Sequence, residues 1–434
     1  MLSENPTLAQ AQILMAKQDY LSFLKLVDQA PETLAGEILG ELYFMRAQIK
    51  LFYSDETLLE DLKMAGKLLP NGNKRPSMGT RFRTDTPNLF TIFYPEGGSL
   101  SRFKLSLHKS LPLLQKFGGD VAVRLAKLCE AEIIYFTGNF EKALAIAEPV
   151  CREATKDSAH YVSIMGGFIL VRCYIALGDA EKLEAAMAQL IRYSKILSRP
   201  DYRELYAKIM GWVNCTTGWM GETPRYHITP SGVRLSVLSD RILVMNEKIN
   251  AHGIFESALY RAAKHTYPEA VSMKDLYARI YEAMVQFNLG KKEQAAAIFY
   301  EVYMLTQKNR VIMPFVEYGA QILPLLQYSL SRKDSARFAR RWSDKLNQMA
   351  TQYEAALLVI RGESDLEKTI TERLTGLEMK VLRLMVDELT IAEISESIGL
   401  PVQTIKEQFR AIYHKMHVHN RSEAIAKAKG SQIV

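Results

Sequence analysis

Polar side chains recur at helical spacing close to the end of the chain. Their spacings are three, one, three and four positions, so they would line one side of a helix that begins near Pro401. Gln, Lys and Arg form hydrogen bonds with base edges and phosphates in the major groove of DNA, and Glu can accept from the amino group of cytosine. The pattern predicts a DNA-reading face, with an ordinary solvated helix surface as the alternative. The residues concerned are Gln403, Lys406, Glu407, Arg410 and His414.

The other side of the same predicted helix is apolar, and we expect it to be buried against neighbouring helices. Its residues are Val402, Ile405, Phe409, Ile412 and Met416. The charge distribution agrees with this division. Residues 371–397 contain three Lys/Arg and six Asp/Glu, a net charge of −3, whereas residues 401–430 contain six and two, a net charge of +4. The positive half is the half that would face DNA.

Three helix starts are predicted around this segment. Each is a Thr or Asn followed three positions later by Glu, the pairing in which two side chains satisfy free N–H groups at a helix start. The pairs are Thr375 with Glu378, Thr390 with Glu393, and Asn420 with Glu423. Gly399 and Leu400 predict a tight turn before the polar helix. A short helix, a tight turn and a second short helix form the helix-turn-helix pattern.

These residues resemble the LuxR-type DNA-binding domain, a four-helix module of bacterial transcription regulators. The resemblance covers about the last 60 residues. It rests on Leu-Thr-x-x-Glu at 374–378, Val-Leu at 381–382, Glu-Ile at 393–394, Thr-Ile-Lys at 404–406 and Lys-Met-x-Val-x-x-Arg at 415–421. The chain departs from the family pattern where Glu388 replaces a usual Gly and where Pro401 replaces a usual Ser at the start of the recognition helix.

The resemblance implies contacts with double-stranded DNA. Positions 406, 407 and 410 correspond to base contacts, and positions 404 and 408 correspond to phosphate contacts. Together with the exposed face, the residues expected at DNA are Gln403, Thr404, Lys406, Glu407, Gln408 and Arg410. One recognition helix reads only a few base pairs, so we expect a homodimer on two half-sites.

The composition of the 434 residues is that of a globular protein, with a net charge of +7. We expect no membrane span, because no apolar run approaches the ~18 residues that one needs. The start of the chain lacks the pattern of a signal peptide, and the four cysteines form no Cys-x-x-Cys pair, so a cytoplasmic location is expected. No catalytic motif, metal-ligand set or cofactor fingerprint is found, so we expect no enzyme activity, no metal and no cofactor.

Most of the chain before residue 365 has the pattern of paired helices. Three hairpins are predicted at 131–150, 171–190 and 281–300, with Gly138, Gly178 and Gly290 at the turns and Ala143, Ala185 and Ala295 as small packing residues. They resemble tetratricopeptide-like repeats, which stack into a superhelix with a concave binding surface. Residues 7–29 predict a single earlier helix, and 37–52 with 56–69 predict a helix pair. Residues 70–102 predict an irregular insert. Its Lys74, Arg75, Arg81, Arg83 and Arg102 form either a basic patch or part of a solvated loop whose aromatic residues pack on neighbouring helices.

The phrase Met-Pro-Phe…Gly…Leu-Pro-Leu-Leu within residues 311–326 resembles the end of the sensor in large ATP-binding LuxR-type regulators of the maltose-regulon-activator kind. In that group an ATPase module precedes a helical-repeat sensor and a LuxR-type domain. The present sequence contains no phosphate-binding loop of the Gly-x-x-x-x-Gly-Lys-Ser/Thr type. The resemblance therefore implies the sensor and effector parts without the ATPase.

We therefore expect an all-α fold with two domains. Residues 1–365 would form a superhelical array of tetratricopeptide-like hairpins, and residues 366–434 would form the LuxR-type helix-turn-helix domain. The expected function is a transcriptional regulator whose sensor binds a small molecule or protein, with RNA polymerase as a further candidate partner. The alternative is a protein-interaction scaffold whose last domain does not read DNA.

Overall fold

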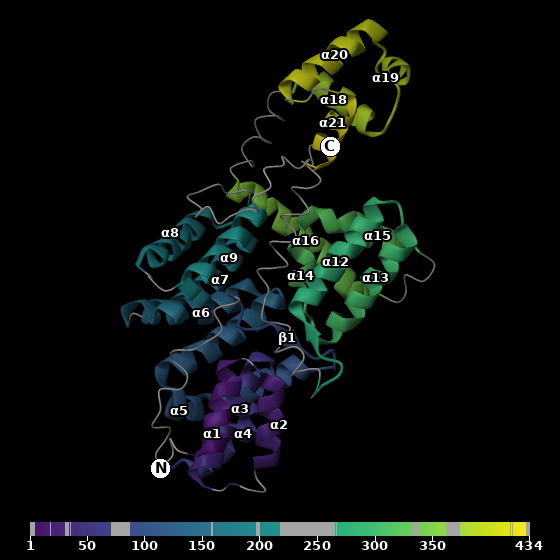
Figure 1. Cartoon of the computed structure of the whole chain (residues 1–434). Helices are drawn as coiled ribbons and strands as arrows, with labels where there is room; N and C mark the ends of the chain where they lie inside the picture. The colour runs from purple at the N-terminus through teal and green to yellow at the C-terminus, as the bar shows by residue number, and fades with distance from the viewer. Residues whose placement is uncertain are drawn as a thin grey trace, which may run out of the picture. The chain divides into compact units, whose positions relative to one another are not determined.

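The computed structural model describes residues 5–17, 19–30, 34, 36–70, 87–157, 159–196, 200–217, 265, 267–332, 338–361, 374–416, 418 and 420–430. Most of the predicted basic patch lies outside these residues, at Lys74, Arg75, Arg81 and Arg83. The described chain forms two compact units, Met1–Ala356 and Leu357–Val434 (Figure 1). The predicted boundary after residue 365 lies nine positions beyond the division between these units, which follows Ala356.

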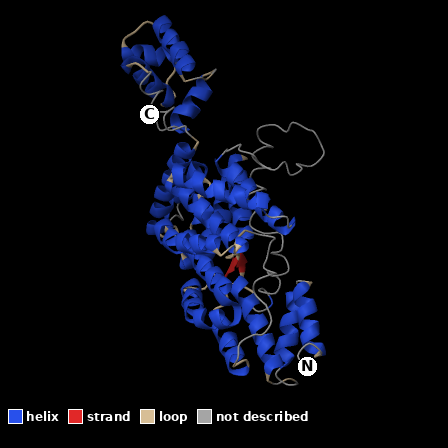
Figure 2. Ribbon diagram, turned by 90° about the vertical axis from the view of Figure 1, so that its left-hand side faces the viewer, coloured by secondary structure: helices blue, strands red, loops and turns tan. Residues whose placement is uncertain are grey.

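The fold is all-α, as the sequence predicts (Figure 2). The strands within the described residues are two short ones, β1 (Ile92–Phe93) and β2 (Val271–Ser272). They pair in antiparallel register, with Ile92 opposite Ser272 and Phe93 opposite Val271. This small ribbon joins segments nearly 180 positions apart in the sequence, and it lies beside the cleft described below.

The first helices are α1 (Pro6–Ala16), α2 (Tyr20–Gln29), α3 (Glu37–Phe52) and α4 (Leu58–Leu68). The predicted single helix over 7–29 is wrong, because the helix is interrupted between α1 and α2. Asp19 starts the second helix there, and its side chain accepts a hydrogen bond from Ser22 N. The α3–α4 pair agrees with its prediction. Phe23, Val27 and Leu42 are fully buried in the core that these helices share.

The predicted irregular insert over 70–102 is also wrong in part. Its second half contains β1 and the first turn of α5 (Ser99–Phe136), a long helix interrupted at Gly119, where φ is +64°. Arg102 lies in this helix. Its guanidinium pairs with Glu56 at 2.6 Å and with Glu96 at 3.3 Å, so it does not belong to a free basic patch.

Helical hairpins follow, as predicted. Helix α5 pairs with α6 (Phe140–Lys156), α7 (His160–Leu177) with α8 (Ala180–Ile196), and α12 (Met273–Asn288) with α13 (Lys292–Thr306), and α9 (Pro200–Thr217) packs against α7 and α8. The turn residues Gly138, Gly178 and Gly290 all have positive φ, which favours glycine. Ala143 and Ala295 are buried, but Ala185 is exposed. One position further on, Ala186 faces the core instead, so the predicted packing residue was off by one place.

The first unit ends with the short helices η3 (Gln307–Asn309), α14 (Met313–Val316) and η4 (Gly319–Ile322), followed by α15 (Leu323–Ser331) and α16 (Arg340–Ile360). The last four residues of α16 fall beyond the division between the units. Helix α16 lies against the turns of earlier elements. A Cβ atom at Gly138 would lie 2.5 Å from Met349 Cε, and one at Gly178 would lie 3.3 Å from Ala356 Cα. Glu354 also accepts a hydrogen bond from Ala320 N at 3.0 Å. The glycines thus permit close approach as well as tight turns.

An ion pair is buried completely in the middle of this unit. Glu132 on α5 and Arg172 on α7 both have 0% side-chain exposure, and the guanidinium donates to the carboxylate. The second carboxylate oxygen accepts from Leu89 N and Phe90 N, each at 2.7 Å. Arg172 also donates to Asn88 Oδ1 at 3.1 Å. The pair therefore fixes the segment before β1 against two helices of the array.

Aromatic rings enclose the guanidinium. The Arg172 Cζ atom lies 4.3 Å from the ring centre of Phe168 and 4.7 Å from that of Tyr135. Rings in this position attract the cation through their negative faces. Burial raises the pKa of Glu132, against the opposing effect of Arg172. The Tyr135 hydroxyl donates to Glu317 at 2.7 Å, which extends the polar contacts to the end of α14.

Within the described residues, one helix is long and apolar enough to cross a membrane by length and composition. This helix is α7, with a mean hydropathy of 1.5. The expectation that no apolar run approaches 18 residues is therefore wrong. In the fold, 89% of α7 is buried, and it packs against α5, α6 and α8. Packing inside the protein accounts for its apolar composition.

Substituting Gly178 tests the close approach of α16. Alanine at Gly178 and alanine at Gly290 both place a Cβ on a left-handed residue, which costs about 1–2 kcal/mol. Only Gly178→Ala also crowds a neighbour, Ala356, whereas a Cβ at Gly290 meets no described atom within 4 Å. We expect Gly178→Ala to lower the free energy of unfolding by about 1 kcal/mol more than Gly290→Ala.

The measurement is urea unfolding followed by tryptophan fluorescence. All three tryptophans of the chain, Trp212, Trp219 and Trp342, belong to the first unit, so the signal reports on that unit alone. Equal losses for the two variants would mean that α16 does not depend on the Gly178 turn.

Candidate nucleic-acid interface

The second unit is built from helices α18 (Gly376–Val386), α19 (Ile391–Ile398), α20 (Val402–Lys415) and α21 (Arg421–Gly430). Each helix contributes to one apolar core. Residues of that core with 0% exposure include Val381, Leu382, Ile394, Ile405 and Ile412. The core joins residues of this unit alone, so it supplies the packing that a small helical domain needs.

The predicted helix starts are all confirmed. Thr375 and Glu378 form a complete capping box, as do Thr390 and Glu393. Asn420 Oδ1 accepts from Glu423 N at 2.9 Å, and the Asn420 amide donates to the Glu423 carboxylate at 2.6 Å. These contacts satisfy N–H groups that a helix leaves free at its start, which fixes where α18, α19 and α21 begin.

The turn between α19 and α20 has the geometry expected of a helix-turn-helix. Gly399 ends α19 with φ of +77°, and the N–H groups of Gly399 and Leu400 both donate to Ser395 O. Pro401 follows directly, and its carbonyl accepts from Ile405 N at 3.2 Å to start α20. Proline cannot donate a hydrogen bond, and at the start of a helix no N–H partner is lost.

The turn after α18 shows the consequence of a sequence departure. Glu388 stands where the resembling family has glycine, and its φ is +67°. Glycine adopts positive φ without strain, and Asn and Asp do so occasionally. For other residues, such as glutamate, this conformation is strained. The backbone therefore keeps the conformation that glycine would favour, although the residue has changed.

Helix α20 has the two faces that the sequence predicts. Ile405, Phe409, Ile412 and Met416 are buried in the core, but Val402 is 43% exposed, so its predicted burial is wrong. Val402 is the first residue of the helix, and the buried stripe starts one turn later. Of the residues expected at DNA, Gln403, Lys406, Glu407 and Arg410 are exposed, and Thr404 and Gln408 are half-buried beside them.

The exposed residues lie together along one side of the helix. Positions 403, 406, 407 and 410 follow a spacing of three, one and three, so their side chains emerge on one side of the helix within about two turns. Two cations, one carboxylate and one amide are thus available to a groove. The described part of His414 is its backbone, which belongs to α20.

Comparison with known proteins decides the family of this unit. Residues 372–428 match the family described as "Bacterial regulatory proteins, luxR family". The C-terminal unit is a LuxR-family helix-turn-helix domain. No solved structure gives a significant match to the chain.

Two curated relatives carry the name "HTH-type transcriptional regulator MalT". The chain is 25% identical over 160 residues to the protein of Vibrio parahaemolyticus and 24% identical over 160 residues to that of Vibrio campbellii. Each match covers 35% of this chain and 18% of the relative. The chain thus spans about a fifth of the length of the relatives that it matches.

Two motif residues of the LuxR-family domain serve its interior. Lys415 donates to Glu378 at 2.7 Å and so joins α20 to the capping box of α18. Arg421 donates to Leu389 O at 2.6 Å, and its guanidinium lies 5.8 Å from the ring centre of Phe409. These two residues of the family motif therefore hold the helices of the domain together. The exposed side of α20 takes no part in these contacts.

The Glu378 carboxylate is held in its charged form. Burial alone would raise its pKa, but hydrogen bonds from Lys415 and from Thr375 outweigh burial and lower it. The capping box and the link to α20 therefore stay intact at neutral pH. Among the described residues, no group of three or more His, Cys, Asp or Glu side chains could hold a metal ion.

Proposed function

We propose that this protein is a DNA-binding transcriptional regulator. The observation that carries the proposal is the exposed side of α20, where Lys406 and Arg410 stand beside Gln403 on a helix whose other side is buried. Side chains of these types read base edges and contact phosphates when a helix enters the major groove. The printed name of the two relatives, a transcriptional regulator, agrees with this reading.

Within the proposal, α20 is the recognition helix. Lys406, Glu407 and Arg410 contact bases, whereas Thr404 and Gln408 contact phosphates. Gln403 extends the same face at the start of the helix. A single recognition helix covers few base pairs, so the active protein binds two half-sites as a homodimer, about 10–10.5 base pairs apart centre to centre.

The first unit supplies the control. A LuxR-family domain with its own core and caps needs no helical array in order to fold. We propose that the hairpins stack as a tetratricopeptide-like superhelix, that the array ends near residue 365, and that it binds an effector which changes DNA affinity. The effector must bind one arrangement of the protein better than another.

The experiment compares the intact chain with residues 357–434. DNA bound by the short fragment is selected from a random library, and the selected sequence is then tested with both proteins in mobility-shift assays. We expect both to bind the same sequence, and we expect ATP to change neither affinity. An effector should change the affinity of the intact chain alone, by about 5–150-fold.

Two results would contradict the proposal. Failure of the fragment and of the intact chain to enrich any DNA sequence would favour a protein-interaction scaffold. A response of the isolated fragment to the effector would remove the reason for assigning control to the first unit. In either case the capped core of the second unit would still be expected to fold, which circular dichroism can check.

A further inference from the structure

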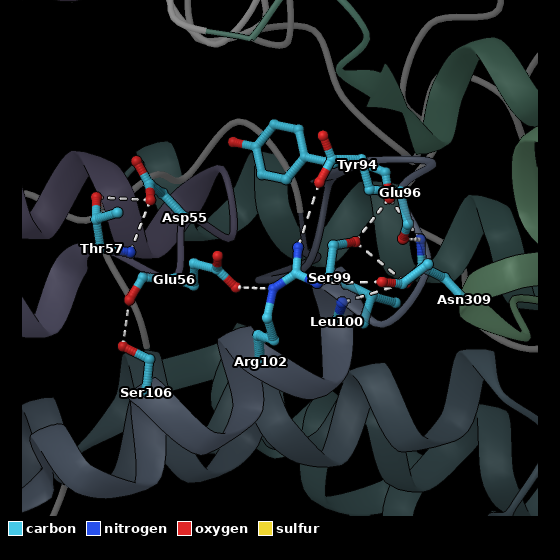
Figure 3. Close-up of polar contacts among 11 residues, drawn as sticks. Asp55, Glu56, Thr57, Tyr94, Glu96, Ser99, Leu100, Arg102, Ser106 and Asn309 are labelled. Atoms are coloured by element: carbon cyan, nitrogen blue, oxygen red, sulfur yellow. Dashed lines mark hydrogen bonds and ion pairs between the residues drawn. The ribbon is translucent and has the colours of Figure 1, made fainter.

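A cleft opens in the first unit where four segments meet, and its ≈ 330 Å³ of empty space includes open solvent. They are the α3–α4 turn, the segment after β1, the start of α5 and the segment before β2. Figure 3 shows the polar contacts around this place. The pairing of β1 with β2 brings the last of these segments beside the others, although it lies more than 160 positions further along the chain.

Two buried polar groups line the cleft with atoms that lack partners. Asp55 is 1% exposed; one carboxylate oxygen accepts from Thr57 N at 2.8 Å and from Thr57 Oγ1 at 2.7 Å. The other, Oδ2, has no hydrogen-bond partner among the described residues. Ser54 is 2% exposed, and its hydroxyl also lacks a described partner. Buried polar atoms are nearly always paired, so this arrangement fits a site for a donor from outside.

The charge around the cleft is negative. Four of its lining residues are acidic and one is basic. Arg102 pairs with Glu56 and Glu96, which leaves the other two carboxylates, Asp55 and Glu269, without an ion pair to any described residue. A ligand with a positive charge would therefore find one buried carboxylate, Asp55, and one exposed carboxylate, Glu269, without ion-pair partners among the described residues.

Two tyrosine rings complete the wall. The ring centres of Tyr94 and Tyr267 are 4.5 Å apart at an interplanar angle of 50°. The Tyr94 hydroxyl is already used, since it donates to Tyr53 O at 2.8 Å. Burial and the neighbouring Asp55 carboxylate raise the pKa of both phenols, and a hydrogen bond between the Tyr267 hydroxyl and Asp55 adds to the rise at Tyr267. Both phenols therefore stay neutral at physiological pH. Aromatic faces next to a carboxylate form the environment that binds organic ammonium groups.

The walls of the cleft are held in place before any ligand arrives. Asn309 Oδ1 accepts from Ser99 Oγ at 3.1 Å and from Leu100 N at 3.2 Å, and the Asn309 amide donates to Glu96 O at 3.0 Å (Figure 3). Arg102 donates to Gly97 O at 3.1 Å. A site whose walls are fixed in advance loses little freedom on binding.

We propose that this cleft binds a small ligand through an ammonium group. The ammonium donates to the free oxygen of Asp55 and to the Ser54 hydroxyl, and the tyrosine rings cover its carbon chain. A metal ion fits less well, because the described residues supply no cluster of three ligands and the aromatic rings supply none. The inference deepens the proposed function, on which it rests only for the ligand's role as effector.

The test uses the intact chain, without DNA, and 1,4-diaminobutane as the probe. We expect saturable binding in titration calorimetry and a rise in the midpoint of thermal unfolding followed by tryptophan fluorescence. Asp55→Asn keeps an acceptor for Thr57 but removes the charge, and it should weaken binding about tenfold or more. Glu269→Gln, at an exposed position, should weaken binding by a smaller factor, about threefold.

Matched controls separate this site from general charge effects. Glu60→Gln removes an exposed carboxylate from α4 that does not line the cleft, and it should leave binding unchanged. Equal stabilisation by neutral 1,4-butanediol would overturn the proposal, as would equal stabilisation by magnesium chloride at the same charge concentration. So would unchanged binding in both Asp55→Asn and Glu269→Gln. Because no DNA is present, a negative result here leaves the DNA-binding proposal untouched.

Discussion

Replacing Glu132 with alanine is expected to lower the free energy of unfolding of the first unit by about 3–5 kcal/mol. The substitution leaves the Arg172 guanidinium in a site with no exposure and without its anion. It also removes the acceptor of the Leu89 and Phe90 N–H groups. Breaking one side of a buried pair is costly because the remaining charge has neither water nor a partner. Urea unfolding followed by tryptophan fluorescence measures the loss in this unit alone.

A double variant separates the cost of the stranded charge from the value of the pair. In Glu132→Gln with Arg172→Met, the glutamine carbonyl can still accept from the two N–H groups, and the cation is gone. We expect this variant to lose clearly less stability than Glu132→Ala. The surface pair between Arg279 and Glu301, whose side chains are about half exposed, provides the control: Glu301→Gln should cost less than about 1 kcal/mol. If Glu132→Ala also lowered the free energy of unfolding by less than about 1 kcal/mol, the result would contradict the burial of the Glu132–Arg172 pair.

One half of this buried pair is visible in the sequence. Arg172 is the one charged residue within the apolar stretch 161–177, and a lone cation in a buried helix needs an anion nearby. Its partner, Glu132, is forty positions away, and nothing in the local spacing links the two. Which carboxylate would meet Arg172 depends on how α5 packs against α7, which is a property of the whole array.

Features that depend on residues three or four positions apart were predicted well. The capping boxes that begin at Thr375 and Thr390 and the apolar stripe from Ile405 to Met416 are local, so the sequence contains all of their determinants. Predictions from local spacing were wrong at the ends of helices and at interruptions between them. The stop between α1 and α2 depends on Asp19, and the exposure of Val402 depends on where the domain core ends.

The cleft at Asp55 could not be predicted from the sequence at all. Its residues come from the α3–α4 turn, from positions near 94 and from positions near 267. The two-residue strands that bring Tyr94 and Tyr267 together are too short to produce an alternating pattern in the sequence. The proposed DNA-reading face differs, because one helix contains all of its residues and helical spacing alone brings them together.

Alanine substitutions at Lys406 and Arg410 are expected to have the largest effects on DNA binding. A lost base contact costs about 1–3 kcal/mol, and in a homodimer each substitution acts at both half-sites. We therefore expect Arg410→Ala to weaken binding to the selected sequence by about 30-fold or more and to relax the preference at one position of each half-site. Lys406→Ala should also reduce discrimination between sequences. Competition assays with point-mutated sites measure both effects.

The controls distinguish base reading from general attraction between charges. Arg383→Ala removes the same charge from the exposed surface of α18, and we expect it to change affinity less than about threefold and to leave sequence preference unaltered. Gln408→Ala, at a phosphate position, should weaken selected and unrelated sequences equally. Glu407→Ala should weaken only sites with cytosine at one position if Glu407 accepts from a base, and should strengthen binding to all sequences if it merely repels phosphates. If both Lys406→Ala and Arg410→Ala kept wild-type affinity and sequence preference, neither cation of α20 would contribute to sequence recognition. Another surface of the domain would then have to contact DNA.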